Sequence, residues 1–467
     1  MALLKPIMDF AATNQRQRAF FQSGATRSVE FRRAQLERLA GALERHEAAL
    51  LSALQADLGK SPSQGYASEF GLVQMEIRHA LRNLRRWAAP KRRRTPWFVA
   101  PARGWVQFEP FGLALILGPW NYPVQLLVSP LVSAIASGNC VVLKPSELAP
   151  QTAEVIVTLL RECFAGDYIS VATGGATVAE ALLRERFDKI FFTGSTRVGR
   201  LVMAAAAKHL TPVTLELGGK CPAIVCADAS LALAARRIAW GKFMNAGQTC
   251  IAPDFVLVER EARDTFVAAM KKALHEFYGD DPARCKDYGR IVNHTHFERL
   301  VNYLRDGKAV HGGRHDAKDL FIAPTLLADV SPDAAVMQEE IFGPVLPVLE
   351  FDKLDDALAL LRGMPAPLAL YVFTRDRATE ARVLADVRSG GACVNDVVSH
   401  MIGTRLPFGG LGESGMGAYH GRAGFETFSH QRAVLRRATW LDLPFRYPPQ
   451  KLSLAGLKRA MRFLLGD

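Results

Sequence analysis

The sequence contains few cysteines, and no two of them form a CxxC pair. The seven cysteines stand at irregular intervals along 467 residues: Cys140, Cys163, Cys221, Cys226, Cys250, Cys285 and Cys393. An odd number without paired spacing argues against both a disulfide framework and a zinc site. We therefore expect no metal site and a reducing compartment, the cytoplasm.

Long apolar runs are also absent. The most apolar run, Leu113–Leu117, is far too short to cross a bilayer. The first ten residues have no sustained apolar stretch after a basic flank, so no signal peptide is predicted. Repeats and low-complexity tracts are missing too. These absences favour a soluble globular chain, and its length predicts two or three domains.

Acidic residues are outnumbered, because 58 Lys and Arg stand against 46 Asp and Glu and give a net charge of +12. The basic residues gather in residues 82–94 and 432–437. No nucleic-acid-binding motif accompanies them, so we expect a solvated face that attracts anionic cofactors and no nucleic-acid partner. Residues 451–467 are predicted to form a basic amphipathic helix. We expect it to pack on the chain's own body, with contact to a membrane surface as the alternative.

Hydrophobic periodicity divides the chain into a helical lead-in and two α/β parts. Helices are predicted over residues 28–57, with Ser28 as the N-cap, and over 69–87. A proline-rich linker with a short ribbon of strand follows over 90–112. Strands at 141–143, 190–192 and 213–217 then alternate with helices at 150–164 and up to about residue 208. A second part has strands at 223–226 and 255–258 and helices at 232–243 and 261–277. This alternation predicts parallel sheets covered by helices, which bind nucleotides at the carboxyl ends of their strands.

Three segments suggest covalent catalysis on a carbonyl group. Cys250 ends the irregular run FMNAGQTC, and a thiol is a good nucleophile when it is ionised. Glu216 follows an apolar strand and precedes two glycines, where a carboxylate can act as a base on water or thiol. Asn121, in PWNYP, can donate a side-chain N–H to a developing oxyanion. Taken singly, each residue is more often a core thiol, a surface acid or a turn amide.

Further segments suggest a nucleotide site. The strand that ends at Thr193 runs into a glycine turn and a helix start, where free N–H groups bind phosphate. The turn lacks the GxGxxG spacing, so this signal is moderate. A lysine and two acids could contact ribose hydroxyls, and one aromatic side chain accompanies them. The candidate residues are Gly194, Ser195, Val198, Gly199, Lys144, Glu147, Glu340 and Phe342.

These segments, in this order, resemble the aldehyde dehydrogenase superfamily over nearly the whole chain. The matching motifs are PWNYP, KPSE, FTGSTRVG, LELGGK, FMNAGQTC, EEIFGP and LPFGG. The residues from Leu406 to His430 and the short N-terminus are similar to the class 3 branch, which includes dimeric enzymes for aromatic and medium- or long-chain aliphatic aldehydes. Fatty-aldehyde members of that branch end in a hydrophobic anchor that this sequence lacks.

The resemblance implies an α/β fold with two Rossmann-like parallel-sheet domains and a β-ribbon. Residues 1–89 and 112–217 are expected to bind NAD(P), 218–403 to form the catalytic domain, and 90–111 with 404–467 to bridge two subunits of a homodimer. Cys250 matches the nucleophile, Glu216 the general base, and Asn121 with the Cys250 N–H the oxyanion hole. Ser195 lies near the pyrophosphate, Lys144 and Glu147 match the adenosine-ribose contacts, and Glu340 and Phe342 the nicotinamide-ribose contacts.

The predicted reaction is NAD- or NADP-dependent oxidation of an aldehyde to a carboxylic acid through a thioester on Cys250. One alternative is a coenzyme-A-acylating enzyme, which typically lacks the Glu216 base. The other is a non-catalytic scaffold or membrane-binding protein that retains the fold. Two departures from the family pattern are Cys221, where many relatives have Ser, and Glu413, where this branch often has a neutral residue.

Overall fold

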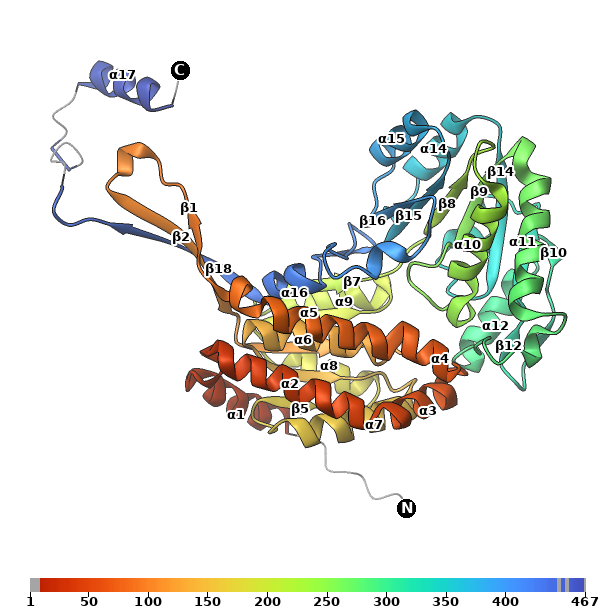
Figure 1. Ribbon diagram of the computed structural model, residues 1–467, viewed down its shortest axis with the longest axis horizontal. Helices are drawn as coiled ribbons and strands as arrows, with labels where there is room; N and C mark the ends of the chain where they lie inside the picture. The colour runs from red at the N-terminus through yellow and green to blue at the C-terminus, as the bar shows by residue number, and fades with distance from the viewer. Residues whose placement is uncertain (1–8, 443–446, 450–452, 466–467) are drawn as a thin grey trace.

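A computed structural model describes residues 9–442, 447–449 and 453–465. Figure 1 shows two α/β bodies side by side and an arm that projects from one of them. The first body begins with the helices α1 (Phe10–Gln22), α2 (Val29–Arg45), α3 (Glu47–Leu58) and α5 (Gly71–Ala88). Ser28 caps α2 by accepting a hydrogen bond from the Phe31 N–H at 3.0 Å, as predicted. The single helix predicted over 28–57 is wrong, because the backbone leaves the helical region at His46.

The first sheet contains β3 (Leu113–Leu117), β4 (Cys140–Lys144), β5 (Ile169–Val171), β6 (Lys189–Thr193), β7 (Val213–Glu216) and β17 (Gly415–Met416). Its strand order is β17-β7-β6-β3-β4-β5, and only β17 runs antiparallel. β3, β4 and β6 are buried throughout, as expected for a parallel sheet covered on both faces. The associated helices are α6 (Gln125–Ser137), α7 (Pro150–Cys163), α8 (Ala176–Arg184) and α9 (Thr196–Ala207).

The second sheet has the order β10-β13-β14-β9-β8-β15-β16, with β10 alone antiparallel. Its strands are β8 (Pro222–Val225), β9 (Phe255–Glu259), β10 (Lys308–His311), β13 (Thr325–Ala328), β14 (Val345–Phe351), β15 (Ala369–Phe373) and β16 (Gly391–Val394). Its main helices are α10 (Leu231–Phe243), α11 (Arg263–Tyr278), α12 (His294–Tyr303), α14 (Leu354–Arg362) and α15 (Arg377–Asp386). The prediction of two parallel sheets is confirmed.

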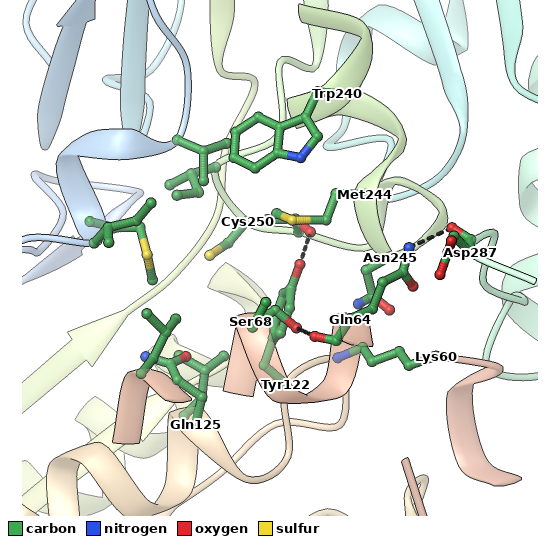
Figure 2. A pocket seen from close by; sticks show the side chains of 18 of the residues that line it. Lys60, Gln64, Ser68, Tyr122, Gln125, Trp240, Met244, Asn245, Cys250 and Asp287 are labelled. Carbon is green, nitrogen blue, oxygen red and sulfur yellow. Dashed lines mark hydrogen bonds between the residues drawn. The ribbon is translucent and has the colours of Figure 1, made fainter. Parts of the chain in front are cut away.

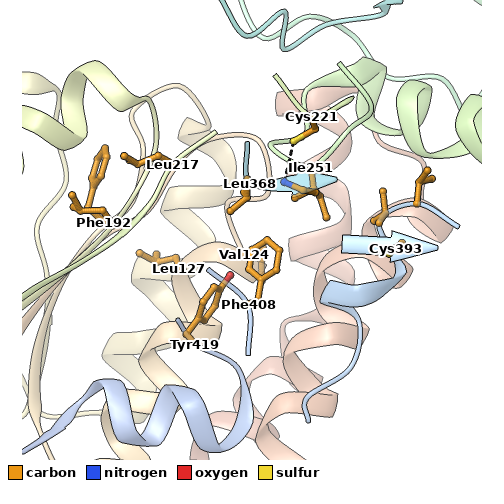
Figure 3. Close-up of a cluster of buried hydrophobic side chains, with 14 of the residues drawn as sticks. Val124, Leu127, Phe192, Leu217, Cys221, Ile251, Leu368, Cys393, Phe408 and Tyr419 are labelled. Atoms are coloured by element: carbon orange, nitrogen blue, oxygen red, sulfur yellow. Dashed lines mark hydrogen bonds between the residues drawn. The ribbon is translucent and has the colours of Figure 1, made fainter. Parts of the chain in front are cut away.

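The shorter elements join these layers. They are α4 (Pro62–Gly65), a π turn at Tyr66–Phe70, α13 (Ala335–Gln338), α16 (Gly421–Thr427), β11 (His315–Asp316), β12 (Phe321–Ile322) and the 3₁₀ turns η1 (Ala25–Arg27), η3 (Trp97–Val99), η4 (Met244–Gly247), η5 (Arg260–Ala262), η6 (Pro282–Arg284) and η7 (Ser399–Met401). Buried apolar side chains from both bodies meet between the two sheets, where Leu127 and Tyr419 lie near Phe408, Ile251 and Leu368 (Figure 3). The hydrophobic core is therefore shared by the two bodies.

The arm is a three-stranded antiparallel ribbon followed by a helix. β1 (Lys91–Arg93), β2 (Ala102–Pro110) and β18 (Ser429–Arg437) pair in that order, with Ser429 opposite Pro110 and Arg437 opposite Ala102. The helix α17 (Leu454–Leu465) confirms the helix predicted for the tail, of which residues 451, 452, 466 and 467 lie outside the described ranges. The prediction that it packs on the body is wrong, because α17 stands beside the ribbon, away from both sheets (Figure 1). No helix in the described ranges has the length and apolar character needed to cross a bilayer.

Candidate active site

Cys250 follows a backbone segment that few residues can adopt. After α10 ends at Phe243, Asn245 and Ala246 have φ of +53° and +52°, and Gly247 has φ of +75°. A Cβ atom at Gly247 would lie 2.2 Å from the Gly343 carbonyl oxygen, so only glycine fits there. A non-glycine residue keeps a left-handed backbone conformation only where the contacts around it impose that conformation. The tight turn therefore places Cys250 between the two sheets.

The Gln248 side chain holds this turn in place through hydrogen bonds. Its side chain is fully buried; Nε2 donates to the Asn245 and Arg290 carbonyls at 3.0 and 2.9 Å, and Oε1 accepts from the Val292 N–H at 3.0 Å. Both the N–H donors and the oxygen acceptor of this amide therefore have hydrogen-bond partners. The motif FMNAGQTC contains Gln248 but indicates no role for it, because two of its three partners, Arg290 and Val292, lie more than 40 residues away.

Glu216, the last residue of β7, faces the Cys250 thiol. The Cys250 Sγ donates to Glu216 Oε1 at 3.8 Å, and the Thr193 hydroxyl donates to Oε2 at 3.2 Å. Burial raises the pKa of Glu216, although Tyr419, His420 and Thr193 partly oppose this. Burial also raises the pKa of the Cys250 thiol well above its ordinary value, and the Glu216 charge adds to the effect. Two negative charges at this separation are unfavourable, so the pair holds at least one proton near neutral pH.

Asn121 lies on the turn that leads into α6, and its side chain is almost fully buried. Its Nδ2 donates to the Gln248 carbonyl at 3.0 Å, which ties the turn to the Cys250 segment. The Asn121 carbonyl accepts from Lys60 Nζ at 2.8 Å and from Asn245 Nδ2 at 2.9 Å. The structure thus brings the three residues predicted for catalysis to one place, where the two bodies meet.

A buried ion pair that sequence reasoning missed supports the Asn121 turn. Lys60 and Glu69 are 1% and 0% exposed, and their charged atoms lie 2.6 Å apart. Glu69 Oε2 also accepts from the Val124 N–H at 2.8 Å and from the Gln125 N–H at 3.3 Å, at the start of α6. Lysine and glutamate are usually exposed, so nothing in the sequence around either residue indicates burial.

Two cavities meet at Cys250 and Glu216, which line both of them. The first has a volume of about 600 Å³ and is bordered mainly by apolar side chains. Figure 2 shows Cys250 in this cavity, with Trp240 and Met244 on one side and Tyr122 and Gln125 on the other. The Tyr122 hydroxyl and the Thr249 hydroxyl are 2.6 Å apart, which holds the wall next to Cys250.

The second cavity, of about 690 Å³, extends from Cys250 towards the start of α9. It brings together seven of the residues predicted for the site: Asn121, Gly194, Ser195, Glu216, Cys250, Glu340 and Phe342. The Ser195 side chain caps α9 by accepting from the Val198 N–H at 3.4 Å. Arg197, Arg200 and Arg299 also line the cavity. Arginine side chains and a helix start suit an anionic diphosphate, so the cavity fits a dinucleotide.

The remaining predicted cofactor residues do not line either cavity. Gly199 lies inside α9, where a Cβ atom would approach Leu217 Cδ2 to 2.7 Å, so it allows the helix to lie close to the sheet. Lys144 and Glu147 form an ion pair of 2.7 Å at the end of β4. Although burial would raise it, the pKa of Glu147 is lowered because the Lys144 ammonium lies beside the carboxylate. The Val198 N–H donates to the Ser195 side chain, and the Val198 side chain packs against the hydrophobic core.

The chain belongs to the aldehyde dehydrogenase family, whose sequence model matches residues 8–434. It is therefore an oxidoreductase that acts on aldehydes with NAD or NADP. It is 44% identical to a 4,4'-diaponeurosporen-aldehyde dehydrogenase of Staphylococcus aureus over 93% of this chain and 95% of that protein. It is 46% identical to human aldehyde dehydrogenase family 3 member B1 over 97% and 96% of the two chains, which confirms the resemblance to the class 3 branch.

Solved structures agree with this assignment. The substrate-bound state of Staphylococcus aureus AldH superimposes with a TM-score of 0.94 at 42% identity, covering 97% of this chain and 99% of that one. An indole-3-acetaldehyde dehydrogenase in complex with NAD⁺ superimposes with a TM-score of 0.83 at 30% identity, covering 91% and 88%. The aldehyde dehydrogenase fold of this chain is thus shown.

Proposed function

We propose that Cys250 attacks the aldehyde carbon and carries the acyl group as a thioester, which water then hydrolyses to the carboxylic acid. The observation that carries this proposal is that Cys250 and Glu216 together form the junction of the two cavities. An aldehyde in the apolar cavity and a dinucleotide in the polar cavity would meet at the Cys250 sulfur. Glu216 lies within reach of the thiol proton and accepts it as the C–S bond forms.

Asn121 and the Cys250 N–H stabilise the oxyanion of the adduct. The Asn121 Nδ2 atom carries two hydrogens, and its hydrogen bond to Gln248 uses one of them. The second hydrogen remains for the substrate oxygen. One such donor contributes on the order of 10²–10³-fold to the rate, so Asn121→Ala lowers kcat by that factor.

NAD or NADP, when bound, accepts the hydride that the adduct loses. The start of α9 with Ser195, Val198 and the Gly194–Gly199 turn would hold the diphosphate, and Lys144 and Glu147 the adenosine ribose. Glu340 and Phe342 would hold the nicotinamide ribose, since both border the cavity near Cys250. After hydride loss, Glu216 releases the thiol proton to solvent and is a carboxylate again. It then takes a proton from water as the water oxygen attacks the thioester carbon, and the Cys250 thiolate leaves with the electron pair.

The substrates are aromatic or medium- to long-chain aliphatic aldehydes. The cavity beside Cys250 is lined by apolar side chains from both bodies, which favour an apolar chain or ring over a charged one: Leu72, Leu126, Trp240, Met244, Phe277, Ile402 and Phe408. The staphylococcal relative is named for a diaponeurosporen aldehyde. A panel of hexanal, decanal, hexadecanal and benzaldehyde tests this preference, and higher kcat/KM for a small polar aldehyde would contradict it.

Glu216→Gln separates the two chemical steps. The variant should form up to one equivalent of NADH per Cys250 in a first phase that is slower than in the parent, because the thiol proton must go to water instead of Glu216. It should then turn over roughly 10²–10⁴-fold more slowly, because thioester hydrolysis has also lost its base. Cys250→Ser should lose both phases. Glu180→Gln, an exposed acid on α8, is the control and should behave as the parent protein.

Three outcomes would contradict this assignment. Steady-state turnover of Glu216→Gln at the parent rate would remove Glu216 from the mechanism. Turnover that requires added coenzyme A and yields an acyl-coenzyme A ester in place of the free acid would make the chain an acylating enzyme. Full activity of Cys250→Ser would exclude the thioester route altogether.

The chain is further proposed to act as a cytoplasmic homodimer. The free edges of β18 and β16 present unpaired backbone groups among the described residues, and a second subunit can cover them. We also propose that residues 1–89 and 112–217 form a cofactor-binding part, residues 218–403 a catalytic part, and residues 90–111 with 404–467 a bridging part. Within the last part, β17 is paired with β7 of the first sheet.

A further inference from the structure

The arm carries positive charge with almost no negative charge near it. Residues 91–108 include five basic residues and no acidic one. Residues 429–441 add three arginines, and α17 adds Lys458, Arg459 and Arg462, again without an acid. Lys91 and Arg432 pair with Glu426 and Glu109 at the base of the ribbon. The charge towards the end of the arm is therefore positive, and it accounts for most of the net charge of +12.

The helix α17 exposes an apolar face beside this charge. Leu454, Leu457 and Met461 recur at intervals of three and four and are 68%, 43% and 46% exposed. This spacing places them on one side of the helix. Lys458 and Arg462 flank that side, and Arg459 projects from the opposite one. Figure 1 shows α17 apart from both bodies, and among the described residues these three side chains stay exposed.

Aromatic side chains join α17 to the end of the ribbon. The Phe463 and Trp97 rings lie 5.9 Å apart, and Trp97 and Phe98 lie 6.2 Å apart, on the 3₁₀ turn η3. All three remain open to solvent, with Phe463 75% and Trp97 62% exposed. The helix and the turn thus form one surface, called here the arm tip: residues 97–98 and 454–463.

We propose that the arm tip binds the surface of an anionic membrane, independently of the chemistry at Cys250. A basic amphipathic helix that lies in the headgroup layer buries its apolar face while its lysines and arginines meet anionic lipids. Tryptophan side chains favour the same layer. The homodimer proposed above would use the edge of β18 along the side of the ribbon, whereas a second arm tip is a poorer occupant of this surface because both tips are basic and would repel each other. Nucleic acid would meet the charge but would leave the leucines uncovered.

Vesicle flotation with the full chain tests the proposal. Two vesicle types are used: pure phosphatidylcholine, and phosphatidylcholine with one third phosphatidylglycerol. The parent protein should float with the anionic vesicles and stay behind with the neutral ones. Lys458→Gln combined with Arg459→Gln should lower the partition coefficient on the order of thirtyfold. Leu457→Gln combined with Met461→Gln should lower it by at least tenfold.

Matched exchanges on the bodies are the controls. Arg184→Gln with Arg284→Gln removes two exposed charges, and Leu210→Gln removes an exposed leucine, without touching the arm. These variants should float like the parent. All variants should oxidise a short, water-miscible aldehyde at the parent rate, which shows that each is folded.

Other results overturn the proposal. The proposal is wrong if the parent protein does not float with anionic vesicles, or if the α17 variants float as well as the parent. If no protein floats and the α17 variants have a lower mass in light scattering than the parent, the helix binds a second copy of the chain. Binding of a DNA duplex without vesicle binding would assign the charge to nucleic acid.

Discussion

At the scale of single residues, Glu340 carries a charge that pH controls. Burial, and then the nearby Asp254, raise the pKa of its carboxyl group to about 8. An ionised carboxylate is the stronger acceptor for a ribose hydroxyl. Because the group ionises only as the pH rises through about 8, NADH should bind up to about tenfold more tightly at pH 9 than at pH 7.

Titration of NADH fluorescence at several pH values measures this dependence. Glu340→Gln keeps an acceptor but cannot ionise, so its dissociation constant should change little over the same range. A variant that retains the parent's full pH slope would show that another group is responsible. The direction also matters, since tighter binding at the lower pH would contradict the assigned role.

The buried ion pair of Lys60 and Glu69 allows the loss of stability on breaking such a pair to be measured. Lys60→Met removes the partner of Glu69 and leaves a carboxylate that is 0% exposed. Such a loss costs about 3–5 kcal/mol of unfolding free energy. Adding Glu69→Gln should recover much of it, since the neutral amide oxygen can still accept from the Val124 N–H. Urea unfolding of both variants measures the difference, and a double variant less stable than Lys60→Met would refute this reasoning.

At the scale of elements, the segment between α10 and Cys250 depends on its glycine. Gly247→Ala forces a side chain into a left-handed backbone and against the Gly343 carbonyl. The backbone strain alone costs about 1–2 kcal/mol, and the displaced turn should misalign Cys250 and lower kcat by at least tenfold. Gly166→Ala is the control, since a Cβ atom there meets nothing within 4 Å. Thermal unfolding and kcat measure both effects; an active, stable Gly247→Ala would show that the turn adapts.

Elements also show how far the sequence predicts this structure. Ser28 caps a helix as its residue type indicates, but the leucine spacing continues through His46, so the break between α2 and α3 was hidden. The tail was predicted as a helix from its periodicity, which does not say what covers its apolar face. The motifs predicted that Cys250, Glu216 and Asn121 share one site. The roles of Gln248 and of the Lys60–Glu69 pair were not predicted, because they depend on contacts with segments far away in the sequence.

At the scale of the whole molecule, the ribbon predicts a dimer. The chain has a mass of 51.2 kDa, so light scattering should give about twice this value. β18 is the outer strand of the ribbon, and its Leu435 side chain is 55% exposed. An apolar side chain on a free strand edge is a site of association between subunits.

Leu435→Asp should therefore shift the chain towards the monomer, because a carboxylate would be buried without a partner in the interface. Leu210→Asp, at a side chain that is 91% exposed outside the arm, is the control and should leave the mass unchanged. The shift should depend on concentration, as expected for a weakened dimer. If both variants keep the parent mass, the ribbon edge is not the interface; if the parent itself is a monomer, the free edges of β18 and β16 remain open in solution.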